Sequence, residues 1–399
     1  MRGKAMVSLQ VEAIVAGHLC LDVIPALARG ACFVPGRTIE AGPVTLATGG
    51  AVSNTGVALH RLGVAVRLVG RVGPDLYGRV VRDIIESYGP GLADGLITAP
   101  GESSAYTIIL SPPGADRMFI HHPGSNATFG ADDVAPELLE RARLLHFGYP
   151  PIMARMRRAG GQELVTLLRR AKEAGLTTSL DWTMIDPAGP AGRIDWQAVL
   201  AVALPYVDVF IPNIEELLMV LDRPSFDRLT AEAGEGAFVD RVPPELLQLV
   251  GAEMLGLGAA VVGLKAGHRG LYLRTAGAER LAALGRAAPA NLDAWAGREL
   301  WAPCFAAELV GTTGAGDATI AGFLMGLLRG FAPEQALAAA NAVGACSVEA
   351  ADALGGVRSW SETAARLEAG WPRLPLEVES PGWCWDETLH IWIGPEDRG

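Results

Sequence analysis

Strand-like and helix-like segments alternate between residues 64 and 211 of this 399-residue chain. Short apolar runs typical of buried strands are separated by segments whose apolar residues have helical spacing. The sequence predicts strands at 66–69, 143–147, 177–181 and 207–211, and helices at 76–88, 163–174 and 196–204. Such a series predicts an α/β fold, with a mainly parallel central sheet and helices on both of its faces.

Two segments depart from this alternation. Residues 33–47 and 104–121 show the two-residue periodicity of strands, as in Tyr106, Ile108 and Leu110, without helical spacing. We expect them to form a small separate β unit.

Composition limits the class of protein. Half of the residues are hydrophobic, yet charged residues interrupt every apolar run before the roughly 18 residues that span a bilayer. Residues 1–10 lack the apolar region of a signal peptide, and the net charge of −11 argues against a nucleic-acid partner. The five cysteines (Cys20, Cys32, Cys304, Cys346 and Cys384) are odd in number and unclustered, which indicates neither disulfides nor a zinc site. We therefore expect a reduced, cytoplasmic protein without a membrane or nucleic-acid partner.

A glycine turn precedes a helix in the last third of the chain. Residues 310–322 read VGTTGAGDATIAG, and apolar residues follow at helical spacing from Ile320 to Phe331. The turn lies at a predicted helix N-terminus, where unpaired amides favour an anion. Asp317 is the only acidic residue in the turn, and its carboxylate could take a proton from a hydroxyl that attacks a phosphorus atom. The alternative is an N-capped core helix after a flexible turn.

A second polar group lies near the N-terminus. A predicted strand at 11–16 leads to Asp22, and Gly49 and Gly50 precede a helix that carries Asn54. The two glycines would let a sugar approach the backbone, and the two polar side chains could hydrogen-bond its hydroxyls. The alternative is a helix capped by Ser53.

A third group follows the strand predicted at 207–211. Asn213 and Glu216 have the spacing of a capping box. They also lie where parallel sheets place ligands, and Glu216 could reach Mg²⁺ through water.

Taken in their order along the chain, the three groups resemble the signatures of the ribokinase family, the PfkB-type sugar kinases, over roughly residues 11–360. The resemblance implies a ribokinase-like fold and ATP- and Mg²⁺-dependent phosphorylation of a small, uncharged sugar. It implies that Asp317 is the catalytic base, with Gly314, Ala315 and Gly316 as an anion hole. Asp22, Gly49, Gly50 and Asn54 would bind the sugar, and Glu216 the metal. The nucleotide would contact Asn213, Lys265, Gly267, Gly270, Thr312 and Asn341.

The resemblance also implies the domain organisation. Residues 1–30, 49–102 and 123–370 would form the kinase core, and 31–48 and 103–122 a β lid over the sugar site. Residues 276–301 are interpreted as an insertion that makes a surface excursion. The tail, 371–399, contains four tryptophans and would bury itself against its own domain or a second subunit, as in a homodimer.

Two positions differ from the family pattern. Gly311 replaces the aspartate that helps to bind a monovalent cation, and of the family's D-x-N-x-R run only Asp181-Trp182-Thr183 is present. A nucleoside kinase, with Phe33, Phe119 or Phe147 against the base, and a catalytically silent homologue remain alternatives. A Rossmann dehydrogenase is disfavoured because no G-x-G-x-x-G follows the first strand.

Overall fold

The computed structural model describes residues 11–31, 33–111 and 118–399. Cys32 and the expected absence of a signal peptide at residues 1–10 lie outside this part of the chain, as do residues 112–117 of the second lid segment. Cys20, Cys304, Cys346 and Cys384 are free thiols.

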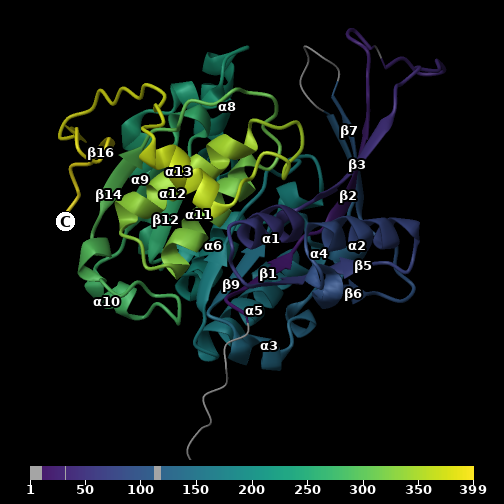
Figure 1. Ribbon diagram of the computed structural model, residues 1–399, viewed down its shortest axis with the longest axis horizontal. Helices are drawn as coiled ribbons and strands as arrows, with labels where there is room; N and C mark the ends of the chain where they lie inside the picture. Colours follow the sequence, from purple (N-terminus) through teal and green to yellow (C-terminus); the bar gives the residue numbers. More distant parts are fainter. Residues whose placement is uncertain (1–10, 32, 112–117) are drawn as a thin grey trace, which may run out of the picture.

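A ten-stranded sheet forms the centre of the molecule (Figure 1). Its first six strands are parallel, in the spatial order β4 (Val66–Val69), β1 (Ala13–Gly17), β9 (Leu144–Gly148), β10 (Thr177–Leu180), β11 (Val209–Phe210) and β12 (Val261–Lys265). Four strands then continue the sheet in antiparallel fashion: β13 (Leu271–Thr275), β14 (Glu299–Ala302), β16 (Ile391–Ile393) and β15 (Cys384–Asp386). The mostly parallel sheet predicted from the sequence is confirmed.

Helices cover both faces of the sheet, because alternate strand residues enter two separate cores. On β1, Ile14 and Ala16 belong to one core, and Ala13 and Val15 to the other. The helices are α1 (Ala51–Arg61), α2 (Leu76–Tyr88), α3 (Pro136–Arg141), α4 (Ala154–Arg157), α5 (Gln162–Glu173), α6 (Trp196–Ala203), α7 (Ile214–Leu221), α8 (Arg223–Ala233), α9 (Pro244–Gly256), α10 (Ala278–Ala282), α11 (Ala315–Leu328), α12 (Pro333–Ser347) and α13 (Trp360–Glu368).

A second sheet projects from one side of the molecule, at the upper right of Figure 1. It contains β3 (Val44–Gly49), β2 (Cys20–Pro25), β7 (Tyr106–Leu110) and β8 (Met118–His122), in that order. Two differences from the sequence interpretation stand out. The strand β2, which we had placed in the kinase core, is part of this sheet, and residues 33–43 form no strand. A short pair, β5 (Arg71–Val72) and β6 (Ile97–Thr98), lies beside α2.

The segment 276–301 is not the surface excursion that we expected. It contains α10 and most of β14, and its Leu281, Trp295 and Trp301 are almost completely buried. The many alanine and arginine residues of the segment obscured this apolar content in the sequence. The segment therefore belongs to the core of the molecule.

The C-terminal tail packs against its own domain. Its strands β15 and β16 extend the main sheet on the side opposite the projecting sheet (Figure 1). Trp383 is buried, with its ring 6.0 Å from that of Trp301 and 6.1 Å from that of Tyr272. Of the two outcomes considered for the aromatic cluster, burial within the domain is the one observed.

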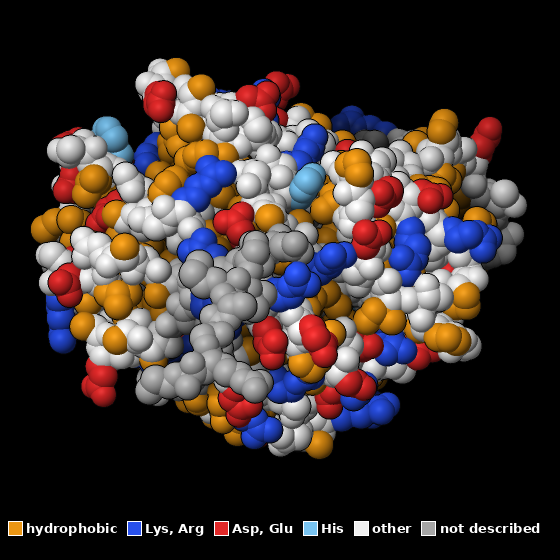
Figure 2. Space-filling model, turned by 60° about the horizontal axis from the view of Figure 1, so that its bottom comes forward, with side chains coloured by type: hydrophobic (Ala, Val, Ile, Leu, Met, Phe, Trp, Pro, Cys, Tyr) orange, Lys and Arg blue, Asp and Glu red, His pale blue; other side chains and the backbone are white. Residues whose placement is uncertain are grey.

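The described residues contain no helix long and apolar enough to cross a membrane. On the face seen in Figure 2, basic and acidic side chains are interspersed.

Candidate active site

The glycine turn leads into α11, as its sequence predicts. Gly314 is the N-cap residue and has φ 74°, a left-handed conformation that glycine adopts without strain. A β-carbon there would also lie 2.4 Å from that of Ala353. The helix is buried on almost every side, whereas the sequence predicted one apolar stripe. The turn is therefore fixed against a rigid, buried helix that holds Asp317 in its first turn.

Asp317 meets the helix that carries the N-terminal motif. Asn54 Nδ2 on α1 donates a hydrogen bond to Asp317 Oδ2 at 3.0 Å, and Thr55 Oγ1 donates to Oδ1 at 3.1 Å. Both donors are buried, and Asp317 is only 4% exposed. Two motifs more than 260 residues apart thus form one polar cluster. Asn54, predicted to bind the sugar, contacts the predicted base through its amide nitrogen, and its contact with the sugar stays a prediction.

A third donor to Asp317 was missed in the sequence. Tyr149 follows β9, and its hydroxyl lies 2.9 Å from Asp317 Oδ1 and 2.8 Å from Oδ2. Burial, followed by the charges of Asp317 and Asp181, raises the pKa of Tyr149 well above its usual value, so its hydroxyl remains protonated. Its position after a buried strand was the only signal available.

Lys265 lies beside the glycine turn. A β-carbon on Gly316 would be 3.2 Å from Lys265 Nζ, which forms a 3.0 Å salt bridge with Asp181. Burial alone would lower the pKa of Lys265, but the carboxylates of Asp181, Glu216 and Asp317 raise it. Burial raises the pKa of Asp181 despite the opposing effect of Lys265. The solvated strand end considered for Lys265 is not observed, since a buried cation faces three carboxylates.

Glu216 and Asn213 form the capping box that their spacing predicts. Asn213 Oδ1 accepts from the Glu215 amide at 3.2 Å, and the Asn213 amide donates to Glu216 Oε2 at 3.0 Å. Burial raises the pKa of Glu216, and Lys265 acts in the opposite direction. The structural role of both residues is thus established, and metal or nucleotide contact remains a proposal.

The two glycines before α1 let protein side chains lie directly against the backbone. A β-carbon on Gly49 would be 2.4 Å from Asp22 Oδ2, and one on Gly50 would be 2.5 Å from His18 Nδ1. Gly50 (φ 88°) is itself the N-cap residue of α1, so the alternative of a helix capped by Ser53 is wrong. Burial raises the pKa of Asp22 to about 6. These glycines bring Asp22 and His18 against the backbone, where we had expected a sugar.

The projecting sheet reaches the same region through a histidine. His121 Nε2 on β8 lies 3.4 Å from His18 Nε2, and His121 Nδ1 lies 3.0 Å from Thr107 Oγ1. The ring of His18 is also 5.9 Å from that of Tyr149. The projecting sheet is therefore in direct contact with the surroundings of Asp317.

Six buried side-chain polar atoms lack a hydrogen-bond partner within the described part of the chain, and His146 Nε2 and Trp182 Nε1 are two of them. His146 belongs to the strand that precedes Tyr149, and burial together with the charge of Lys265 lowers its pKa to about 3. Trp182 follows Asp181 directly. Because unpaired buried polar groups are costly, His146 Nε2 and Trp182 Nε1 could each pair with a polar ligand or with a water molecule.

The glycine turn predicted to contact the nucleotide is present, whereas Asn341 bonds to the backbone. Gly267 (φ 55°) and Gly270 (φ 89°) make the turn between β12 and β13. Asn341 is 2% exposed and donates to the carbonyls of Ala302 and Pro303 at 2.9 and 3.2 Å. Its amide group thus holds the end of β14, and its contact with adenine stays a prediction.

The aromatic residues weighed for a nucleobase are not assembled into one site. Phe147 is completely buried in β9, whereas Phe33 and Phe119 are 41% and 58% exposed. This arrangement does not favour the nucleoside alternative.

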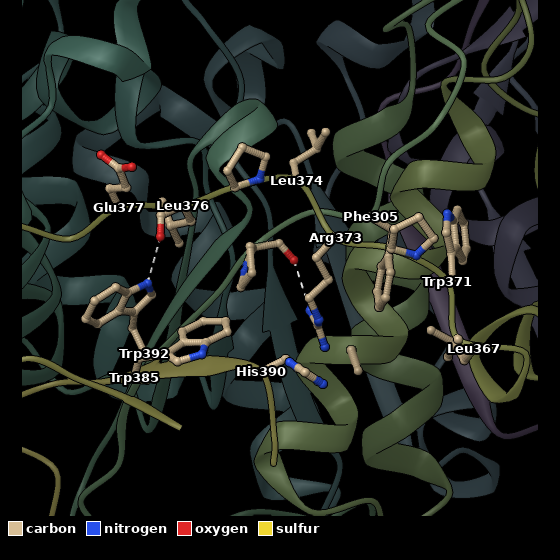
Figure 3. A pocket seen from close by; sticks show the side chains of 15 residues that line it. Phe305, Leu367, Trp371, Arg373, Leu374, Leu376, Glu377, Trp385, His390 and Trp392 are labelled. Carbon is tan, nitrogen blue, oxygen red and sulfur yellow. Dashed lines mark hydrogen bonds between the residues drawn. The ribbon is translucent and has the colours of Figure 1, made fainter. Parts of the chain in front are cut away.

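A large hollow of about 970 Å³ lies beneath the tail, away from the polar cluster (Figure 3). Phe305, Trp371, Trp385 and Trp392 line it, with Arg373 donating to the Pro303 carbonyl at 3.0 Å. None of its lining residues bonds to Asp317 or Lys265. The candidate site is therefore identified by its polar side chains and not by the volume of a hollow.

Comparison with known proteins agrees with this geometry. A family profile described as pfkB family carbohydrate kinase matches residues 12–358. Fructokinase-1 of Zea mays is 26% identical over 269 residues, which cover 62% of this chain and 79% of the relative. An uncharacterized sugar kinase of Archaeoglobus fulgidus is 25% identical over 73% of this chain and 95% of its own.

Solved structures share the fold. Xylella fastidiosa fructokinase with bound ATP has a TM-score of 0.66 and 20% identity, covering 90% of this chain and 98% of its own. Arabidopsis thaliana ribokinase, complexed with ribose and ATP, has a TM-score of 0.66 and 18% identity over 90% and 99% of the two chains. The predicted ribokinase-like fold is confirmed.

Proposed function

The chain belongs to the pfkB family of carbohydrate kinases and is an ATP-dependent sugar kinase, and we propose that it phosphorylates a hydroxyl of a small, uncharged sugar with Asp317 as general base. The observation that carries this proposal is the buried Asp317 carboxylate, held by donors from α1 and β9 at the start of α11.

In the proposed step, the acceptor hydroxyl oxygen attacks the γ-phosphorus of ATP, and Asp317 takes the hydroxyl proton. A new oxygen–phosphorus bond forms, the bond from the γ-phosphorus to the bridging oxygen breaks, and ADP leaves. The attack needs a carboxylate close to the phosphoryl group, and Asp317 lies in the first turn of the helix whose N-terminus would face that group.

The glycine turn and Lys265 would stabilise the charge on the phosphoryl group. The N-terminus of α11, with Gly314 and Gly316, offers backbone dipoles that favour an anion. The Ala315 amide makes a 3.3 Å bond to the Thr312 carbonyl here, so it would have to leave this weak turn bond to join them. Lys265 Nζ is close enough to Gly316 to reach the same anion.

Mg²⁺ fits this site as part of a complex with ATP. The described residues contain no cluster of three or more His, Cys, Asp or Glu side chains that could hold a metal ion alone. Mg²⁺ in kinases is held by one or two carboxylates together with phosphate oxygens, and the half-buried Glu216 carboxylate has the required chemistry. When bound, the ion would neutralise negative charge between the phosphates.

The charges around the site favour an uncharged acceptor. Asp22 is buried beside Gly49 and would repel a phosphate. Arg71, one of the arginines that could have balanced a phosphate, is engaged with Glu102 at 3.1 Å and Asp133 at 3.0 Å. Arg37 is exposed on the segment between β2 and β3. Since a dianionic substrate requires matching cations, we propose a neutral sugar, with fructose the first candidate because several relatives are fructokinases.

An ADP-release assay with the purified protein tests the acceptor. It compares kcat/KM for fructose, ribose, 2-keto-3-deoxygluconate and adenosine with that for fructose 1-phosphate and fructose 6-phosphate. We expect a neutral sugar to be the best substrate. A phosphorylated sugar that is better by about tenfold or more would overturn the proposed acceptor class, because a difference of that size exceeds 1 kcal/mol.

The variant Asp317→Asn tests the base. It keeps an acceptor oxygen for one of the two α1 donors and removes the proton acceptor, so kcat should fall about 10²–10⁴-fold with little change in ATP affinity. ATP binding measured by calorimetry is the control for folding. A variant that kept a tenth of the turnover would exclude Asp317 as the base.

A further inference from the structure

We propose that Tyr149 is a positioning residue that orients the Asp317 carboxylate and leaves room on it for the acceptor hydroxyl. This proposal rests on the proposed role of Asp317 as base. Tyr149 lies in the sequence between a buried strand and a pair of prolines, and the proposal gives it a role in positioning the base.

The carboxylate of Asp317 has more acceptor sites than it has donors. A carboxylate offers about four lone-pair sites. One oxygen accepts from Asn54, the other accepts from Thr55, and the single hydroxyl hydrogen of Tyr149 is shared between the two oxygens. Only Tyr149 contacts both oxygens, and it alone can free a site without leaving the carboxylate.

The acceptor hydroxyl would take that site. When the sugar binds, the Tyr149 hydroxyl settles on one oxygen of Asp317, and the other oxygen accepts the hydroxyl of the sugar. The amide of Asn54 and the hydroxyl of Thr55 then fix the remaining edges of the carboxylate. The phenol thereby sets the plane in which Asp317 receives the proton.

The backbone around Tyr149 is built to fix this position. Tyr149 has φ 66° and ψ 40°, a left-handed conformation that is strained for a residue with a side chain. Pro150 follows it, and residues before proline normally favour extended backbone. A β-carbon on the preceding Gly148 would lie 2.0 Å from that of Ala51, so strand β9 is locked against α1 immediately before the strained residue. Strain of this kind persists where the surrounding structure imposes it, often at functional sites.

The charges near Tyr149 keep its hydroxyl a donor. Asp317, Asp181 and Glu216 all disfavour its ionisation, and burial has the largest effect. Lys265 is the buried cation among these carboxylates. A protonated phenol in this setting donates to Asp317 over the whole range in which kinases are assayed.

The variant Tyr149→Phe removes one hydroxyl and tests the proposal. We expect kcat to fall about 10- to 100-fold, because misplacement of a reacting group by about 1 Å has an effect of this size. KM for the sugar and for ATP should stay within about threefold of wild type, since Tyr149 would act on the base and not on binding. The acid limb of the kcat profile should move to higher pH, because a carboxylate that loses a donor is protonated more readily.

Tyr272→Phe is the matched control. Tyr272 is a fully buried tyrosine whose hydroxyl donates to Glu299 Oε1 at 2.7 Å, in the antiparallel part of the sheet. Its removal deletes a phenol–carboxylate bond of the same kind without touching the polar cluster. It should lower the melting temperature and leave kcat and its pH profile unchanged. Rates are measured well below the melting temperature of each variant, so that all compare folded protein.

The outcomes separate the two proposals. Loss of kcat with an unchanged KM and a displaced acid limb in Tyr149→Phe supports the positioning role. Wild-type kcat and an unchanged profile overturn it, and if Asp317→Asn is inactive in the same assays, the base assignment survives. If Asp317→Asn keeps a tenth or more of its activity, the base assignment itself fails, and the role of Tyr149 fails with it.

Discussion

Replacing Asp22 with asparagine should stabilise the protein at neutral and alkaline pH while impairing the kinase. Asp22 is only 8% exposed, and burial raises its pKa from an ordinary 3.8 to about 6, against the opposing hydrogen bonds from Cys20 and Thr107. The ionised carboxylate of Asp22 therefore lowers the free energy of unfolding, because it is desolvated in the folded chain and hydrated in the unfolded chain. A buried charge without a cationic partner is the kind of feature that stability alone would not retain.

The size of the effect follows from the pKa. The difference between 3.8 and about 6 corresponds to roughly 3 kcal/mol of unfolding free energy. Above about pH 6, Asp22 is ionised in both states and the full cost is present. As the pH falls toward 3.8, the folded chain takes up a proton that the unfolded chain does not, and the cost disappears. Because the asparagine amide needs acceptors of its own, we expect Asp22→Asn to gain about 1–3 kcal/mol near pH 8 and almost nothing near pH 4.

Urea unfolding of both proteins across this pH range measures the difference. Asp227→Asn is a suitable control, since Asp227 forms an exposed ion pair with Arg223 on α8 and should show no comparable pH-dependent gain. The acceptor KM of Asp22→Asn should rise, consistent with a charge retained for function. A variant that is less stable than wild type near pH 8, or a difference that does not change with pH, would refute the reasoning.

Two further changes probe the phosphate side of the site. Glu216→Gln keeps an oxygen for the Asn213 amide but loses the charge. The Mg²⁺ concentration for half-maximal rate should therefore rise several-fold, while the melting temperature changes little. A lower melting temperature with an unchanged Mg²⁺ response would leave only the capping role. Potassium should activate this enzyme weakly, because Gly311 supplies no carboxylate and a β-carbon there would lie 2.8 Å from the Ala350 carbonyl oxygen. Rates measured in potassium and in tetramethylammonium salts test this. Strong potassium dependence would mean that backbone oxygens suffice to bind the cation.

The parallel half of the fold could be predicted because its signals are local. Strand and helix periodicity placed β4 and α2 at their observed bounds. The glycine turn before α11 was also evident, since the helix N-terminus and its left-handed Gly314 are encoded within a few residues. The contact of Asn54 with Asp317 was not predicted. It arises from the packing of α1 against α11, which joins segments that no local pattern relates.

The errors have similar physical causes. The helix cap proposed as an alternative at Ser53 lies instead at Gly50, whose left-handed backbone is not encoded by a capping side chain. The segment 276–301 was judged by its alanine and arginine content, whereas Trp295 and Leu281 determine its burial. Tyr149 escaped notice because a left-handed tyrosine before proline contradicts the backbone preferences from which sequence patterns are read.

The charges of the site explain why it suits a phosphoryl transfer. Asp317, Asp181 and Glu216 all act on the cation of Lys265, and Asp181 and Asp317 are almost completely buried. A free polyphosphate would meet this excess of negative charge, so only the helix N-terminus and Lys265 would favour it. The same polyphosphate with a divalent cation brings the missing positive charge, which the carboxylates then stabilise. These charges therefore support the proposed binding of a metal–nucleotide complex, and the proposed neutral acceptor would add no further anion beside Asp22.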